Sequence, residues 1–184
     1  ETALVQSAGS GVGMAGVQIA KQVVGARVFT TAGTDEKVAK ARELGADVAI
    51  NYTTQDFLAE VLRLTEGRGV QVALDMVGGQ VFARSQQALA EGGRLVSVGR
   101  SSGEAPEEDR ALTERKGQRV VTGWALGSLR TPEYASQELA RIVELVAQGT
   151  LKTIIDRVFP LREAAEAHRH LASRAQFGKV ILRP

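Results

Sequence analysis

The chain has 184 residues, of which 43% are hydrophobic and 24% charged, and it contains no cysteine. This composition predicts about one globular domain and excludes a disordered tail, a fibre and a disulfide scaffold. The 23 Lys and Arg residues nearly balance the 21 Asp and Glu residues, and only 4% of residues are aromatic, so a nucleic-acid partner is not expected. No apolar run reaches the roughly 18 residues that a membrane span needs, and the lack of cysteine favours a cytoplasmic protein.

Short β-branched segments alternate with longer amphipathic ones, which is typical of βα crossover units on a parallel sheet. Strands are predicted at residues 3–6, 27–31, 48–50, 70–76, 94–98 and 119–122. Helices are predicted at residues 12–24, after Thr34 as far as Gly45, at 57–65, at 81–89 and at 133–147. Residues 101–116 carry a charge run and are expected to form a solvated loop with room for a short helix.

The alternation predicts an α/β fold of the Rossmann type, with a doubly wound parallel sheet and helices on both faces. Residues 1–150 are expected to form this Rossmann-type domain. After residue 150 the pattern changes to a strand at 155–159, a helix at 161–171 and a strand at 179–182, so residues 151–184 are expected to be a separate small segment. The chain opens at Glu1 and enters an apolar run at once, so we expect it to begin partway through a longer protein.

The turn after the first predicted strand is the main ligand-binding signal. Residues 4–13 read LVQSAGSGVG, with Ala8, Ser10 and Gly13 at the three glycine positions of a dinucleotide fingerprint. Small residues allow a tight turn and a close approach to a pyrophosphate, while the helix N-terminus offers free N–H groups. A tight turn without a ligand is the alternative, but the strand before it and the helix after it favour nucleotide binding.

The end of the second predicted strand favours NADPH over NADH. NAD-binding proteins usually carry an acidic residue there to bind both ribose hydroxyls, whereas this chain has Ala32 followed by Gly33. Gly33 and Thr34 leave room for a 2′-phosphate, and Lys37, one turn into the next helix, is placed to neutralise it. Asp35 remains the alternative ribose ligand, although the helix dipole by itself explains an acid in the first turn.

No catalytic residue and no metal site are predicted, because the sequence has no Ser/His/Asp set, no paired carboxylates and no metal-ligand spacing. His168 and His170 are two residues apart on a predicted helix, so they point about 200° apart and cannot share a metal. Both are expected at the surface.

Further blocks are distributed along the chain: SGVG at 10–13, VQIAK at 17–21, ARELGAD at 41–47, INY at 50–52, GRGV at 67–70, DMVGG at 75–79, GGRLV at 92–96, FPL at 159–161, EAAEAH at 163–168 and GKV at 178–180. Together they resemble the medium-chain dehydrogenase/reductase superfamily, in its quinone oxidoreductase (zeta-crystallin-like) branch. The resemblance covers almost the whole chain.

The resemblance implies an NADPH-dependent oxidoreductase that transfers hydride to a small molecule, a quinone or a conjugated carbonyl. It implies that Ser10, Gly11, Val12 and Gly13 hold the pyrophosphate, that Gly33, Lys37 and Tyr52 surround the ribose and its 2′-phosphate, that Val77 and Gly78 lie on the adenine side, and that Val98, Gly99, Arg100, Ser101, Gly123, Trp124 and Ala125 follow the nicotinamide half. For Trp124, closing the core or making a subunit contact is an equal alternative.

The resemblance also implies a β-rich, GroES-like substrate domain before this region, to which residues 151–184 return, so that part of the active site lies outside this chain. A homodimer through the sixth strand near Val120 and Val121 is expected. The alternatives are an enoyl reductase, including the enoyl reductase module of a polyketide synthase, a zinc-type NAD-dependent alcohol dehydrogenase, and a non-enzymatic nucleotide-sensing domain.

Overall fold

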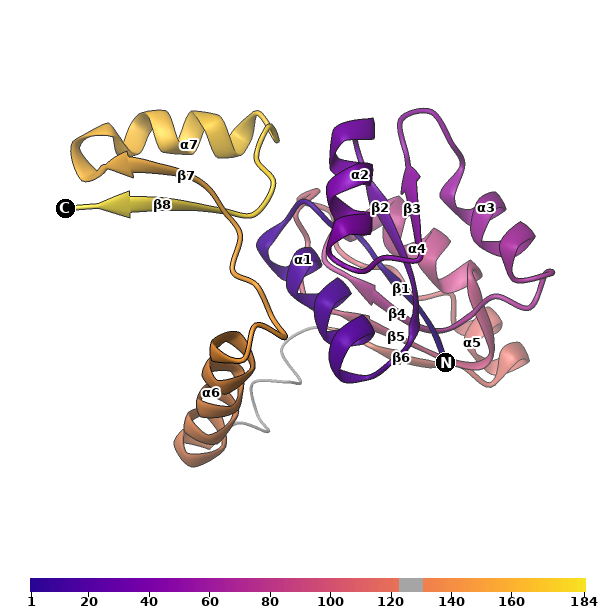
Figure 1. Ribbon diagram of the computed structural model, residues 1–184. Coiled ribbons are helices and arrows are strands. Elements are labelled where there is room, and N and C mark those ends of the chain that lie inside the picture. The colour runs from indigo at the N-terminus through magenta and orange to yellow at the C-terminus, as the bar shows by residue number, and fades with distance from the viewer. Residues whose placement is uncertain (123–130) are drawn as a thin grey trace.

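The computed structural model describes residues 1–122 and 131–184, and its main body is a six-stranded sheet (Figure 1). The strands are β1 (Thr2–Val5), β2 (Arg27–Ala32), β3 (Val48–Asn51), β4 (Val70–Asp75), β5 (Leu89–Ser97) and β6 (Arg119–Val121). They are arranged in the order β3-β2-β1-β4-β5-β6, and every neighbouring pair is parallel. This is the strand order of the Rossmann fold, so the predicted fold class is confirmed.

Five helices connect these strands: α1 (Gly11–Gln18), α2 (Asp35–Glu43), α3 (Phe57–Leu64), α4 (Gly79–Gln87) and α5 (Arg110–Lys116). Successive residues of a strand point to opposite faces of the sheet, so each strand can contribute side chains to the core on both faces. In β1, Ala3 and Val5 pack into the core cluster that α1 and α2 cover, while Leu4 belongs to the cluster beneath α3 and α4. The helices therefore lie on both faces of the sheet, as expected.

Side chains at the N-termini explain where several helices begin. Ser10, Thr34, Asp56 and Asp109 each accept a hydrogen bond from the backbone N–H three residues later. Each such cap stabilises its helix by about 1 kcal/mol. Residues within the glycine-rich turn and the turn after β2 therefore determine where the next helix begins.

The predicted elements are present, with differences at some ends. The first helix ends at Gln18 and continues as a π-helical turn, Ile19–Val23. β5 starts at Leu89, ahead of the predicted residue 94, because its pairing with β4 shifts register between Val70 and Val72. Within the predicted loop at 101–116, Asp109 and the left-handed Gly117 cap the seven-residue helix α5.

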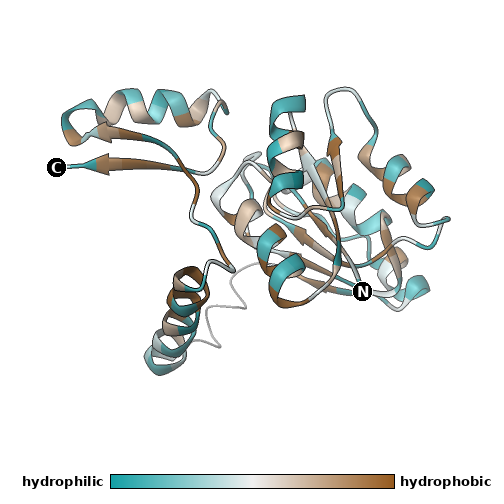
Figure 2. Cartoon of the chain, viewed as in Figure 1, coloured by the Kyte–Doolittle hydropathy of each residue, from teal (hydrophilic) through white to brown (hydrophobic). Residues whose placement is uncertain are grey.

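The C-terminal part contains the helix α6 (Pro132–Ala147) and a second, two-stranded parallel sheet of β7 (Ile155–Pro160) and β8 (Lys179–Arg183). The helix α7 (Ala164–Ala172) connects the two strands and lies along this small sheet, apart from the main body (Figure 1). Several apolar residues of α6, β7 and β8 are exposed, and Figure 2 colours hydrophobic stretches of these elements brown. Leu139 of α6 is 61% exposed and Ile155 of β7 is 53% exposed. None of the described helices is both long and apolar enough to cross a bilayer.

Candidate functional site

A cavity of about 710 Å³ opens where β1, β2 and β4 end, at the carboxyl edge of the main sheet. Its volume falls within the roughly 300–1,000 Å³ that is usual for small-molecule and cofactor sites. In open α/β sheets, ligands bind at this edge, where the strand order reverses between β1 and β4. Residues 171–176 of the C-terminal part form a further wall of the same cavity.

The glycine-rich turn forms one side of the cavity. Gly9 and Ser10 line it directly, and Gly11, Val12 and Gly13 form the first turn of α1 beside it. The Ser10 hydroxyl accepts the Gly13 N–H at 2.9 Å. A Cβ at Gly13 would overlap the Ser7 carbonyl oxygen, so glycine is required for this close approach of helix and strand. The N-terminus of α1 thus faces the cavity edge, where an anion is stabilised.

The cavity wall beside the end of β2 is formed by Gly33, by Lys37 of α2 and by Tyr52, which directly follows β3. A Cβ at Gly33 would lie 2.6 Å from the Tyr52 hydroxyl, so the missing side chain allows the ring to sit against the backbone. Thr34 does not line the cavity but caps α2, accepting the Lys37 backbone N–H at 3.2 Å.

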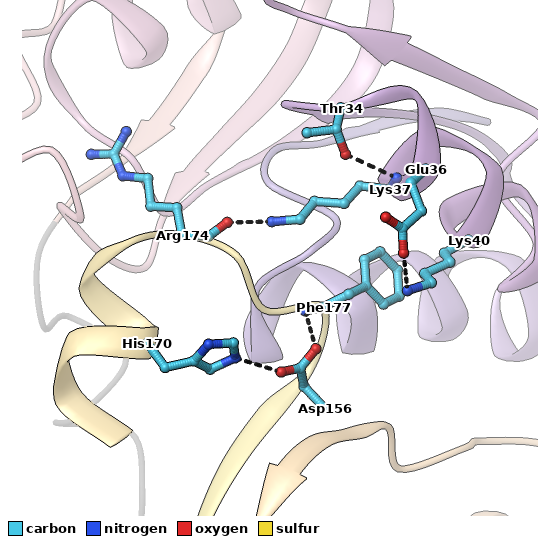
Figure 3. Close-up of polar contacts among 8 residues, drawn as sticks. All are labelled: Thr34, Glu36, Lys37, Lys40, Asp156, His170, Arg174 and Phe177. Carbon is cyan, nitrogen blue, oxygen red and sulfur yellow. Dashed lines mark hydrogen bonds and ion pairs between the residues drawn. The ribbon is translucent and has the colours of Figure 1, made fainter. Parts of the chain in front are cut away.

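The Lys37 ammonium donates to the Arg174 carbonyl oxygen at 2.5 Å (Figure 3). Burial lowers the pKa of Lys37, partly offset by the nearby carboxylates of Asp156 and Glu36. An ammonium group has three N–H donors, so this contact leaves others free for a ligand. The contact with Arg174 therefore fixes the position of the Lys37 ammonium group at the edge of the cavity.

The side chain of Asp35, the alternative ribose ligand, forms a hydrogen bond outside the cavity. Its carboxylate accepts a 2.7 Å hydrogen bond from the Asn51 side-chain amide, and it is not among the lining residues. No acidic side chain of residues 1–122 and 131–184 lines the cavity, whereas Lys37, Arg84 and Arg174 do. Arg84 is already paired with Asp56, so Lys37 and Arg174 are the cations that give the cavity its positive character.

The turn after β4 contributes Val77, and the turn after β5 contributes Ser101, which donates its N–H to the Met76 carbonyl at 3.0 Å. The fully buried Asp75 carboxylate accepts N–H groups from Val77 at 3.2 Å and Gly78 at 3.1 Å. Burial raises the pKa of Asp75 despite these hydrogen bonds.

The other residues expected on the adenine side and along the nicotinamide half do not line this cavity. Gly78, Val98, Gly99 and Arg100 lie in these same turns but outside the cavity lining. The predicted contacts at Gly123, Trp124 and Ala125 lie outside the described residues.

Several cavity residues were not expected from the sequence. Gln6 directly follows β1, and Thr31 is the second-last residue of β2 and donates to the Gln6 side-chain oxygen at 2.5 Å. Their position close to the strand ends was the available signal in the sequence. Arg174 and Gln176 come from the C-terminal part, 137 residues or more from Lys37, so no local pattern connects them to the site.

His168 is exposed, as predicted, whereas His170 is only partly exposed. Only 14% of the His170 side chain is exposed, because its ring nitrogen Nε2 lies 2.7 Å from the Asp156 carboxylate. No cluster of three or more metal-ligating side chains occurs in the part of the chain that the structure describes.

Comparison with known proteins defines the class. Residues 44–182 match the zinc-binding dehydrogenase family. The chain therefore belongs to this family, within the medium-chain dehydrogenase/reductase superfamily, and its relatives include quinone oxidoreductases.

Three relatives illustrate the range of the family. A phenolphthiocerol/phthiocerol polyketide synthase protein of Mycobacterium tuberculosis is 36% identical over 99% of this chain, which covers 8% of the synthase protein. The structure of Escherichia coli quinone oxidoreductase complexed with NADPH superposes with a TM-score of 0.90 at 32% identity, covering 100% of this chain and 57% of the oxidoreductase. An NAD-dependent alcohol dehydrogenase superposes with a TM-score of 0.85 at 36% identity, covering 100% of this chain and 51% of that enzyme. The chain thus spans about half the length of these two enzymes.

Proposed function

We propose that this chain is the NADPH-binding part of an oxidoreductase that transfers hydride to a quinone or a conjugated carbonyl. One observation carries the proposal: the cavity at the end of β2 is lined by Gly33, Lys37, Tyr52 and Arg174, and by no acidic residue among the described ones. A 2′-phosphate adds negative charge at the adenosine ribose. Such a lining stabilises that charge, whereas a carboxylate at the end of β2 would repel it.

The glycine-rich turn fits the pyrophosphate of the same cofactor. The first turn of α1 presents free N–H groups, and the tight Gly13 contact lets the backbone approach closely. The Lys179 side chain lies directly over Gly11, where a Cβ would overlap it, and adds a cation at this end. We therefore assign the pyrophosphate to Ser10–Gly13 and the 2′-phosphate to the end of the cavity at Lys37.

The cofactor supplies the hydride chemistry, while the chain binds and orients it. We assign residues 1–150 to the cofactor domain and residues 151–184 to a segment that joins a substrate domain. The exposed apolar surfaces of β7 and β8 support this assignment, because a two-stranded sheet is only marginally stable without further cover. The turns at Val77–Gly78 and Val98–Ser101 are assigned to the adenine and nicotinamide sides.

An enoyl reductase of a polyketide synthase is the second candidate, supported by the 36% identity with the mycobacterial synthase over nearly the whole chain. The two candidates differ in the acceptor rather than in the cofactor. Oxidation of NADPH by the protein with 1,4-benzoquinone, compared with a crotonyl thioester, discriminates between them. Turnover of the quinone supports the first candidate, and turnover of the thioester alone supports the second.

Calorimetric titration of the chain with NADPH and NADH in parallel tests the cofactor assignment. We expect tighter binding of NADPH. Preferential binding of NADH would instead favour the alcohol dehydrogenase type. Binding of either cofactor without turnover of any acceptor by the whole protein that contains this chain would favour a nucleotide-sensing domain.

We also propose a homodimer through β6, in a cytoplasmic protein. Among residues 1–122 and 131–184, β6 pairs with β5 on one side and no described strand pairs with its other edge, which is therefore open to a second copy of the chain. Sedimentation equilibrium tests this proposal, and a monomer at high concentration contradicts it.

A further inference from the structure

The C-terminal wall of the cavity, residues 171–176, is held at both ends by one carboxylate. His170 directly precedes the wall, and its ring nitrogen Nε2 lies 2.7 Å from the Asp156 Oδ2. Phe177 directly follows the wall, and its backbone N–H donates to the Asp156 Oδ1 at 2.9 Å. Figure 3 shows both contacts converging on Asp156, which belongs to β7.

The contact between His170 and Asp156 is partly shielded from water. Their side chains are 14% and 20% exposed, so solvent screens this contact less than it screens the exposed ion pair elsewhere on α7. Burial alone would raise the pKa of Asp156, but hydrogen bonds from Phe177 and His170 outweigh it and hold that pKa below its ordinary value. The carboxylate is therefore stabilised in its charged form by the two groups that flank the wall.

The wall is also attached to the cofactor domain. The Phe177 ring is 4% exposed and packs in the core cluster shared by α1 and α2, and the Gly178 N–H donates to the Gly9 carbonyl at 3.0 Å. Between these attachments and His170, the Arg174 carbonyl accepts the Lys37 ammonium at 2.5 Å. A displacement of the wall would therefore move the acceptor that orients Lys37.

We infer that Asp156 and His170 are positioning residues for the cofactor: their contact fixes the C-terminal wall, and the wall holds Lys37 and Arg174 where a 2′-phosphate binds. This inference rests on the proposed NADPH site. It assigns a role in nucleotide selectivity to a histidine and an aspartate that touch neither the glycine-rich turn nor the cavity itself.

His170→Ala tests the inference by calorimetry with NADPH and NADH. NADPH affinity is expected to fall about three- to tenfold, which is the effect of losing one hydrogen bond, while NADH affinity stays within about twofold because NADH has no 2′-phosphate. His170→Gln, whose amide nitrogen can occupy the place of Nε2, is expected to restore most of the NADPH affinity. His168→Ala removes an exposed histidine from the same helix and is expected to change neither affinity.

Hydrogen exchange without a cofactor gives an independent reading, since the Phe177 amide should exchange faster in Asp156→Ala than in the wild type. An unchanged NADPH affinity in His170→Ala overturns the inference and leaves the proposed function intact. An equal loss of NADPH and NADH binding also overturns it, because the pair then only maintains the fold. A wild-type chain with no preference for NADPH overturns the proposed function and this inference with it.

Discussion

The side-chain amide of Asn51 donates a 2.7 Å hydrogen bond to the carboxylate of Asp35. Asp35 is the acidic residue closest in sequence to the end of β2, and this hydrogen bond holds its carboxylate against β3. The residues that line the cavity at this point are Gly33, Lys37 and Tyr52. In the proposed site, the choice between the two nicotinamide cofactors depends on the basic lining, and Asp35 has a structural role.

Asp35→Ala is accordingly expected to leave both NADH and NADPH affinity within about twofold of the wild type. It removes a hydrogen bond and an acid from the first turn of α2, so the free energy of unfolding should fall by about 1 kcal/mol. Urea unfolding and calorimetry on the same preparation measure the two effects. A loss of NADH binding in this variant would show that Asp35 binds the ribose.

Lys37→Ala is expected to weaken NADPH binding by about tenfold or more, because a charge-assisted hydrogen bond contributes about 1.5–3 kcal/mol. NADH binding should change little. Arg42→Ala is the matched control, since it removes an exposed cation from the same helix and tests whether net charge alone matters. Equal losses in the two variants would contradict a direct contact of Lys37 with the phosphate.

Two glycine substitutions should separate folding from binding. In Gly13→Ala the new methyl group overlaps the Ser7 carbonyl, which belongs to the backbone, so the free energy of unfolding should fall by about 1–3 kcal/mol.

In Gly33→Ala the methyl group meets only the end of the Tyr52 side chain, so the free energy of unfolding should change by less than about 1 kcal/mol while NADPH affinity falls. Urea unfolding with parallel calorimetry measures both, and a large loss of stability in Gly33→Ala would contradict this account of the Tyr52 contact.

The buried Asp75 predicts a specific pH dependence. Burial raises the pKa of its carboxyl in the folded chain, so the folded state binds this proton more tightly than the unfolded state does. Its contribution to stability is present below about pH 4, the ordinary range of an aspartic acid, and is lost as the pH rises through the folded pKa.

Asp75→Asn cannot ionise and lacks this loss. The stability of Asp75→Asn relative to the wild type should therefore increase with pH over that interval, whatever the baseline cost of the substitution. Urea unfolding at a series of pH values measures it, and a constant difference would contradict the raised pKa.

The sequence was sufficient for the main sheet and for one half of the candidate site. Strand and helix periodicity predicted the Rossmann fold, and the small residues at Ser10–Gly13 and Gly33 placed the expected pyrophosphate and ribose contacts at two turns. These features are local, because tight turns, caps and strand ends are determined by residues close together in the chain.

The C-terminal wall could not be predicted, because it depends on contacts between residues far apart in the sequence. Arg174 reaches Lys37 across 137 positions, and His170 meets Asp156 only after α7 folds back along β7. The partial burial of His170 could not be predicted for the same reason, since a helical pattern shows a polar face but not the carboxylate that covers it. α5 was also obscured by the charge run before it, although Asp109 and Gly117 supply its caps.

The end of the cavity at Lys37 and Arg174 is proposed to bind a 2′-phosphate. The most direct measurement compares the affinity of the chain for 2′,5′-ADP with that for 5′-AMP, which lacks only the 2′-phosphate. We expect at least about tenfold tighter binding of 2′,5′-ADP, because charge-assisted hydrogen bonds to a phosphate are strong, and we expect Lys37→Ala to remove most of the difference. Equal affinity for the two nucleotides in the wild-type chain would contradict it.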